Sequence, residues 1–157
     1  MNIAIVSYYF NDHHAEGIVT AKLARGLSEA GHNVTVFGKL IGSQKIVDKD
    51  LVNLKYFKID SKIPSWWKFL KKVNPPIALG RKILAIPNLI TYNSPNDYGW
   101  IVEAKKAIIR EHRKRPFDII HSRLNPHSSH QVALSIKKAD PKIPWCAYFS
   151  DPWPPHR

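Results

Sequence analysis

The stretches Asn2-Ile3-Ala4-Ile5-Val6-Ser7-Tyr8 and Asn33-Val34-Thr35-Val36-Phe37-Gly38 decide the fold class of this chain. Residues 2–8 are nearly all apolar and hardly alternate, which predicts a strand buried on both faces. Between the two stretches, residues 18–30 carry apolar side chains at helical spacing, and a glycine follows at the helix end. The candidate core residues of this helix are Ile18, Ala21, Leu23, Ala24 and Leu27. Strand, helix and strand in this order predict a βαβ unit with parallel strands and a right-handed crossover.

The same alternation of strands and helices continues along the chain. Further strands are predicted at 54–59, 117–121 and 144–149, the first of them near a sheet edge because it alternates more. Helices are predicted at 100–115 and 128–138. Their candidate core residues are Ala104, Ala107, Ile108, Val132, Leu134 and Ile136. The pattern predicts an α/β fold, Rossmann-like and doubly wound, with a mainly parallel sheet.

The whole chain, residues 1–157, is expected to form one domain. Residues 62–98, with five prolines, are predicted to be an irregular excursion within it. A doubly wound sheet requires another helix to cover its last strand. We therefore expect the domain to be truncated at Arg157.

The composition of the chain indicates the cellular compartment in which the protein is expected. The single cysteine, Cys146, allows no internal disulfide, which suits a reducing compartment. The apolar run at the N-terminus has no basic segment before it, and no apolar stretch reaches about 18 residues, so neither a signal peptide nor a membrane span is predicted. We expect a cytoplasmic protein that can lie peripherally on the inner face of the membrane.

Positive charge is concentrated in the middle of the chain. Residues 61–115 contain twelve Lys or Arg and three Asp or Glu, whereas residues 1–60 contain seven and six. A localised basic stripe indicates an anionic partner, such as membrane lipid, phosphorylated substrate or nucleic acid. A solvated lysine-rich face would give the same count.

The loop after the first strand differs from a dinucleotide site. It lacks the G-x-G-x-x-G pattern, because Gly17 stands alone behind a histidine-rich insert. A loop that ends at a helix N-terminus can still offer backbone N–H groups to a phosphate. Glu16 and Gly17 are therefore candidates for a donor-phosphate loop, although Gly17 can equally be a simple helix-start glycine.

Several segments together resemble the N-terminal domain of family 4 glycosyltransferases, closest to bacterial enzymes that build surface polysaccharides. They are Ser7-Tyr8-Tyr9-Phe10 with Glu16-Gly17, Ala30-Gly31-His32-Asn33-Val34-Thr35-Val36, Pro95-Asn96-Asp97-Tyr98-Gly99-Trp100, Phe117-Asp118-Ile119-Ile120-His121-Ser122-Arg123 and Ser150-Asp151-Pro152-Trp153. The resemblance covers nearly the whole chain. It implies the N-terminal, acceptor-side half of a GT-B architecture, whose C-terminal domain holds most of the nucleotide-sugar site and is missing from this chain. Transfer would proceed with retention, without metal or other cofactor, and the fragment alone is expected to be inactive.

The resemblance also implies roles for residues at the strand ends. Arg123 stands where many relatives have a histidine, and an arginine can hold negative charge but cannot act as a base near neutral pH. Asp151 is the candidate that orients or deprotonates the acceptor hydroxyl, and a turn aspartate is its structural alternative. The remaining acceptor-side candidates are His121, His127, His130 and Trp153, with plain surface histidines as the alternative for His127 and His130.

Residues 63–90 mix aromatic and basic side chains, as a membrane-surface segment requires. The candidates for that contact are Trp66, Trp67, Lys68, Lys71, Lys72, Arg81 and Lys82. The alternative is an excursion that packs on the domain's own core. No nucleic-acid module accompanies the segment, so we expect no nucleic-acid partner, and no ligand cluster predicts a metal.

Two functions follow. The first is a glycosyltransferase that uses a nucleotide sugar and a lipid-linked or polysaccharide acceptor. The second is a non-catalytic, basic Rossmann-like module that binds an anionic partner, either membrane lipid or nucleic acid.

Overall fold

The computed structural model describes residues 1–10, 14–39, 53–60, 95–123 and 127–150. The strands are β1 (Asn2–Val6), β2 (Asn33–Lys39), β3 (Leu54–Ile59), β4 (Ile119–Arg123) and β5 (Trp145–Tyr148). The helices are α1 (Ala15–Glu29), α4 (Pro95–Lys114) and α5 (Ser128–Ala139).

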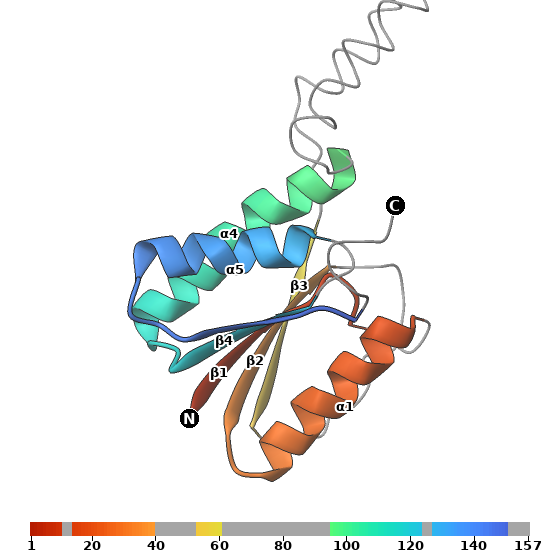
Figure 1. Ribbon diagram of the computed structural model, residues 1–157, viewed down its shortest axis with the longest axis vertical. Coiled ribbons are helices and arrows are strands. Elements are labelled where there is room, and N and C mark those ends of the chain that lie inside the picture. Colours follow the sequence, from red (N-terminus) through yellow and green to blue (C-terminus); the bar gives the residue numbers. More distant parts are fainter. Residues whose placement is uncertain (11–13, 40–52, 61–94, 124–126, 151–157) are drawn as a thin grey trace, which may run out of the picture.

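The five strands form one sheet in the order β3-β2-β1-β4-β5, and every neighbouring pair is parallel. The predicted Rossmann-like α/β fold is confirmed, and so is the position of β3 at a sheet edge (Figure 1). β1 lies in the centre because it is apolar on both sides: Ala4, Ile5 and Val6 are all fully buried.

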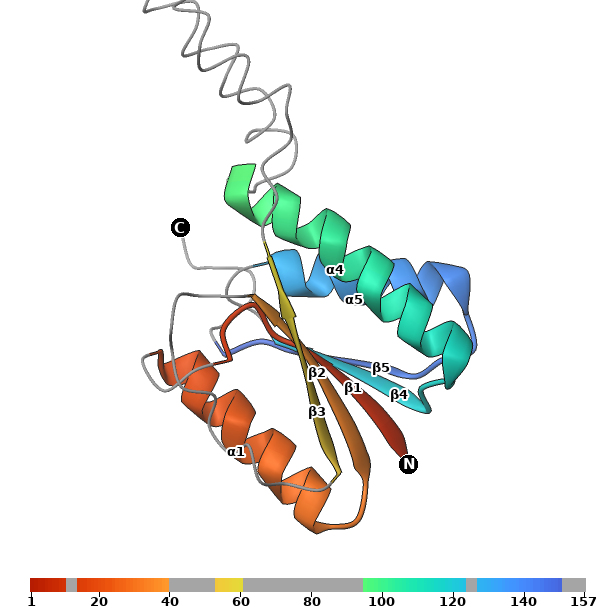
Figure 2. The same cartoon turned by 180° about the vertical axis from the view of Figure 1, so that it is seen from behind.

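Helices cover both faces of this sheet. α1 lies on one face and α4 and α5 lie on the other, as the two opposite views show (Figures 1 and 2). Each face has its own apolar core. Ile5, Val34 and Val36 pack toward α1, while Val6, Phe37 and Ile120 pack with α4 and α5. The fold is therefore doubly wound.

The prediction that Ile18 and Leu134 lie in the core was wrong. Ile18 is 38% exposed, because the buried side of α1 follows Gly17, Thr20, Ala21, Ala24 and Ser28. Leu134 is also 38% exposed, since Val132, Ala133 and Ile136 define the buried side of α5. In α1 small residues face the sheet, and Ile18, about 100° around the helix from Gly17, lies to the side of that face. In α5, Leu134 lies on the side opposite Val132 and Ile136.

The observed start of α4 and the observed bounds of β4 differ from the predicted ones. The predicted helix at Trp100 begins at Pro95, where a proline suits the first helical turn. The predicted strand 117–121 is shifted to Ile119–Arg123. Phe117 instead packs in the core below the strand. As a result Arg123 is the last residue of β4.

The end of α1 agrees with its predicted glycine stop. Gly31 has φ of 83°, a left-handed conformation that side chains with a Cβ rarely adopt. Among the described helices, none is both long and apolar enough to cross a bilayer.

Candidate functional site

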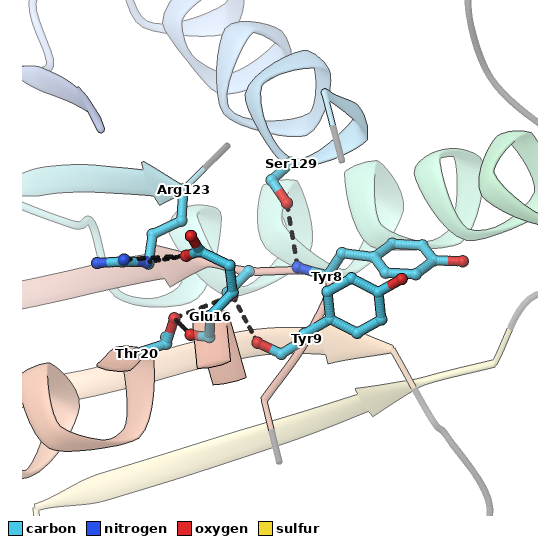
Figure 3. Close-up of polar contacts among 7 residues, drawn as sticks. Tyr8, Tyr9, Glu16, Thr20, Arg123 and Ser129 are labelled. Atoms are coloured by element: carbon cyan, nitrogen blue, oxygen red, sulfur yellow. Dashed lines mark hydrogen bonds and ion pairs between the residues drawn. The ribbon is translucent and has the colours of Figure 1, made fainter. Parts of the chain in front are cut away.

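Some of the described candidate residues, namely Glu16, Gly17, Arg123 and His127, lie at the carboxyl edge of the sheet. Because the strands are parallel, the ends of β1 and β4 lie together, with Val6 beside Ser122 in register. The helices α1 and α5 both begin at this edge. The Tyr8 backbone N–H donates to Ser129 Oγ of α5 over 3.0 Å (Figure 3). Open parallel sheets bind their ligands at such an edge.

Arg123 and Glu16 form a largely buried ion pair at this edge. The Arg123 Nε and Nη2 atoms lie 3.1 and 2.9 Å from the same Glu16 oxygen (Figure 3). Their side chains are 5% and 17% exposed, respectively. The guanidinium also lies over the Tyr148 ring, 4.2 Å from its centroid. β4 and the first turn of α1 are thus joined by a desolvated, geometrically defined contact.

This pair changes the interpretation of Glu16. A carboxylate accepts hydrogen bonds and repels a phosphate, so Glu16 cannot itself bind a donor phosphate. It holds Arg123 in position and offsets its charge. Gly17 is buried in the first turn of α1, and its conformation is helical. The start of α1 lies beside Arg123.

Short hydroxyl contacts attach the start of α1 to the end of β1. Ser7 Oγ donates to the Tyr9 carbonyl over 2.6 Å, and Thr20 Oγ1 donates to the Glu16 carbonyl over 2.6 Å. The two hydroxyl oxygens lie 3.2 Å apart. His14 caps α1 in an extended conformation without a side-chain hydrogen bond to the helix. Glu16 is therefore held from both its backbone and its carboxylate.

His130 belongs to a second polar group, between β4, β5 and α5. The Trp145 Nε1–H donates to Ser122 Oγ over 2.8 Å, and His130 Nδ1 lies 2.7 Å from the same oxygen. Burial, followed by the charges of His127 and His121, lowers the pKa of His130 to about 4. The imidazole is therefore neutral at pH 7. Ser122 is fully buried, so this pair fixes α5 to the sheet and cannot act as a nucleophile and base.

His121 lies on β4, between Ile5 and Cys146 in register. It is half-buried, and its Nε2 has no hydrogen-bond partner within the described part of the chain. Burial and then the positive charge of Arg123 lower its pKa. Burial, more than the neighbouring charge, therefore favours the neutral form of this imidazole. His127 is exposed at the N-terminus of α5.

A third group at this edge was not singled out from the sequence. The Lys39 ammonium, at the end of β2, donates to the Tyr8 hydroxyl and lies 4.5 Å from the centre of its ring. Burial raises the pKa of Tyr8, and a hydrogen bond to Asp97 raises it further. Burial lowers the pKa of Lys39. Tyr8 appears in the quoted motif at the end of β1, but nothing in the sequence pairs it with residues 31 and 89 positions away.

The structure leaves part of the predicted site untested. Asp151 and Trp153 lie outside the described residues, and so do all the membrane-surface candidates: Trp66, Trp67, Lys68, Lys71, Lys72, Arg81 and Lys82. Within the described residues, no group of three or more His, Cys, Asp or Glu side chains could hold a metal ion.

Comparisons with known proteins bear on the fold. No protein-family model matches the chain, and curated proteins include no significant match. Among solved structures, the C-terminal domain of a hydrogenase from Pyrococcus furiosus is similar, with a TM-score of 0.51 and 15% sequence identity. The match covers 94% of this chain and 89% of that domain. At this identity the similarity supports the Rossmann-like fold alone.

Proposed function

We propose that this chain is the acceptor-side domain of a retaining glycosyltransferase. The enzyme would transfer a sugar from a nucleotide-sugar donor to a lipid-linked or polysaccharide acceptor. A second Rossmann-like domain would supply most contacts to the donor. The proposal rests on the ordered sequence motifs and on the residues that meet at the carboxyl edge.

The observation that carries the proposal is the buried Arg123–Glu16 pair. Sugar transfer breaks the bond between the anomeric carbon and the diphosphate, so negative charge develops on the leaving phosphate oxygens. A guanidinium held in place before the substrate arrives stabilises such charge. Glu16 accepts from two of the five Arg123 N–H donors, and in this proposal the others turn to a phosphate oxygen. Glu16 limits the cost of keeping this cation desolvated.

Acceptor recognition would use the Lys39–Tyr8–Asp97 group. An ammonium and a carboxylate side by side can donate to and accept from sugar hydroxyls, and Tyr9 adds an aromatic ring beside them. The acceptor oxygen would then bond to the anomeric carbon while the nucleoside diphosphate leaves with the electron pair. In this proposal, Asp151 orients the acceptor hydroxyl or takes its proton.

Sugar transfer by a two-domain form of the protein is the direct test. Radiolabelled nucleotide sugars would be offered with lipid-linked and polysaccharide acceptors. We expect Arg123→Met to lower turnover by about 10²–10³-fold, the usual effect of losing one donor to a developing anion. Arg25→Met, which removes an exposed arginine on α1, is the matched control and should leave turnover unchanged.

Two outcomes would contradict the proposal. One is no transfer from any donor by the two-domain form. The other is full activity of Arg123→Met. The 157-residue chain by itself is expected to transfer no sugar, because most donor contacts would be missing.

A further inference from the structure

A cleft lies at the opposite, amino edge of the sheet, away from the residues discussed above. It has a volume of about 430 Å³ and lies between the starts of β2 and β3 and the end of α4. Its lining residues are Asn33, Val34, Thr35, Asn53, Leu54, Lys55, Glu111, Lys114, Arg115 and Phe117. Clefts that bind small molecules are usually about 300–1,000 Å³, so this one can hold more than a simple ion.

The cleft carries an excess of positive charge. Lys55, Lys114 and Arg115 line it against a single carboxylate, Glu111, so the excess is two formal charges. The C-terminal carbonyls of α4 offset a further part of this charge. The remaining positive potential favours an anionic ligand.

Two of these cations form ion pairs with Glu111. Lys55 Nζ lies 3.0 Å from one Glu111 oxygen, and Lys114 Nζ lies 3.2 Å from the other. The Glu111 side chain is only 11% exposed, and the hydrogen bond from Lys55 leads the interactions that lower its pKa. Both ammonium groups therefore approach Glu111 at the wall of the cleft, while the two lysine side chains stay 61% and 65% exposed.

The rest of the lining is neutral and mainly polar. Val34 and Leu54 border the cleft, but their side chains pack on the α1 side of the sheet, and Phe117 is 7% exposed. Asn33, Asn53 and Thr35 add amide and hydroxyl groups that can bond to oxygen atoms. Such a lining suits a ligand with a charged, oxygen-rich end.

We propose that this cleft binds a phosphate monoester, its phosphate lying against Lys114 and Arg115. The phosphate would add charge-assisted hydrogen bonds that the lysines do not make to Glu111. A soluble organic phosphate and the headgroup of a phospholipid offer this chemistry equally. The site is distinct from the carboxyl edge and does not depend on glycosyl transfer.

Phenyl phosphate is a suitable probe. A titration of the ¹⁵N-labelled 157-residue chain, followed by NMR, should show saturable shifts at the amides of Asn53, Lys55 and Arg115. Lys114→Gln should weaken binding about three- to fivefold, as expected for one partly screened charge. Lys106→Gln is the matched control. Lys106 also pairs with a glutamate three residues earlier on α4 but does not line the cleft, so its loss should leave the affinity unchanged.

A second titration with dihexanoyl phosphatidic acid distinguishes the two sources. Tighter binding of the lipid would identify a headgroup site, and tighter binding of phenyl phosphate would identify a soluble ligand. No saturable shift at the cleft with either probe would overturn the proposal. Equal weakening by Lys106→Gln and Lys114→Gln would overturn it too, because binding would then reflect net charge alone.

Discussion

The Arg123–Glu16 pair predicts an asymmetric response to mutation. Glu16→Gln leaves a guanidinium that is 5% exposed without a countercharge. Breaking a buried pair in this way usually costs about 3–5 kcal/mol, and the stacking on Tyr148 retains part of the stabilisation. We therefore expect Glu16→Gln to lower the free energy of unfolding by about 2–3 kcal/mol.

Arg123→Met should lower the free energy of unfolding by less than Glu16→Gln does. The carboxylate left behind is 17% exposed and lies in the first turn of α1, where the helix dipole stabilises an anion by about 0.3–1 kcal/mol. We expect a loss of about 1–2 kcal/mol. The double variant should be no less stable than Glu16→Gln alone, because it removes the unpaired cation.

Urea denaturation of the 157-residue chain and its variants measures these differences directly. Glu29→Gln is the control, since the Arg25–Glu29 pair has a comparable distance of 2.7 Å but both side chains are 53% exposed. Its expected cost is below about 0.5 kcal/mol. If Glu16→Gln cost no more than Glu29→Gln, the pair would be an ordinary surface contact, and our argument for a desolvated Arg123 would fail.

Three further predictions concern catalysis, pH and membranes. In the two-domain form, Asp151→Asn should lower turnover by about 10²–10⁴-fold while stability stays unchanged; wild-type turnover would remove Asp151 from the mechanism. His130 has a lower pKa in the folded chain, about 4 against 6.5, so its neutral form stabilises the fold above pH 6.5 and this contribution is lost as the pH falls toward 4. The free energies of unfolding of wild type and His130→Gln, plotted against pH, should therefore converge over that range. A constant difference between them would contradict the pKa assigned to His130. Through its segment 63–90, the chain should bind anionic liposomes and sediment with them at low salt but not at high salt. Equal binding to neutral liposomes would refute a charge-dependent contact.

The class of fold could be predicted because its signals are local. Buried apolar runs, helical spacing and the glycine at position 31 each depend on residues within a few positions of one another. The more alternating composition of 54–59 predicted a strand at the sheet edge, and β3 lies there. Local signals failed where two faces of a helix were both apolar, which is why Ile18 and Leu134 were misplaced.

The sequence by itself determined that this chain forms a parallel, doubly wound sheet and that its candidate residues lie near the ends of strands. Only the tertiary structure decided which of those residues meet. Arg123 and Glu16 are 107 positions apart, and Tyr8 and Ser129 are 121 apart, yet both pairs are in hydrogen-bond contact. Such contacts depend on the strand order and on the extent of β4, whose last residue is Arg123. Both are set by packing of the whole sheet, because no residue near Arg123 in the chain specifies its partner.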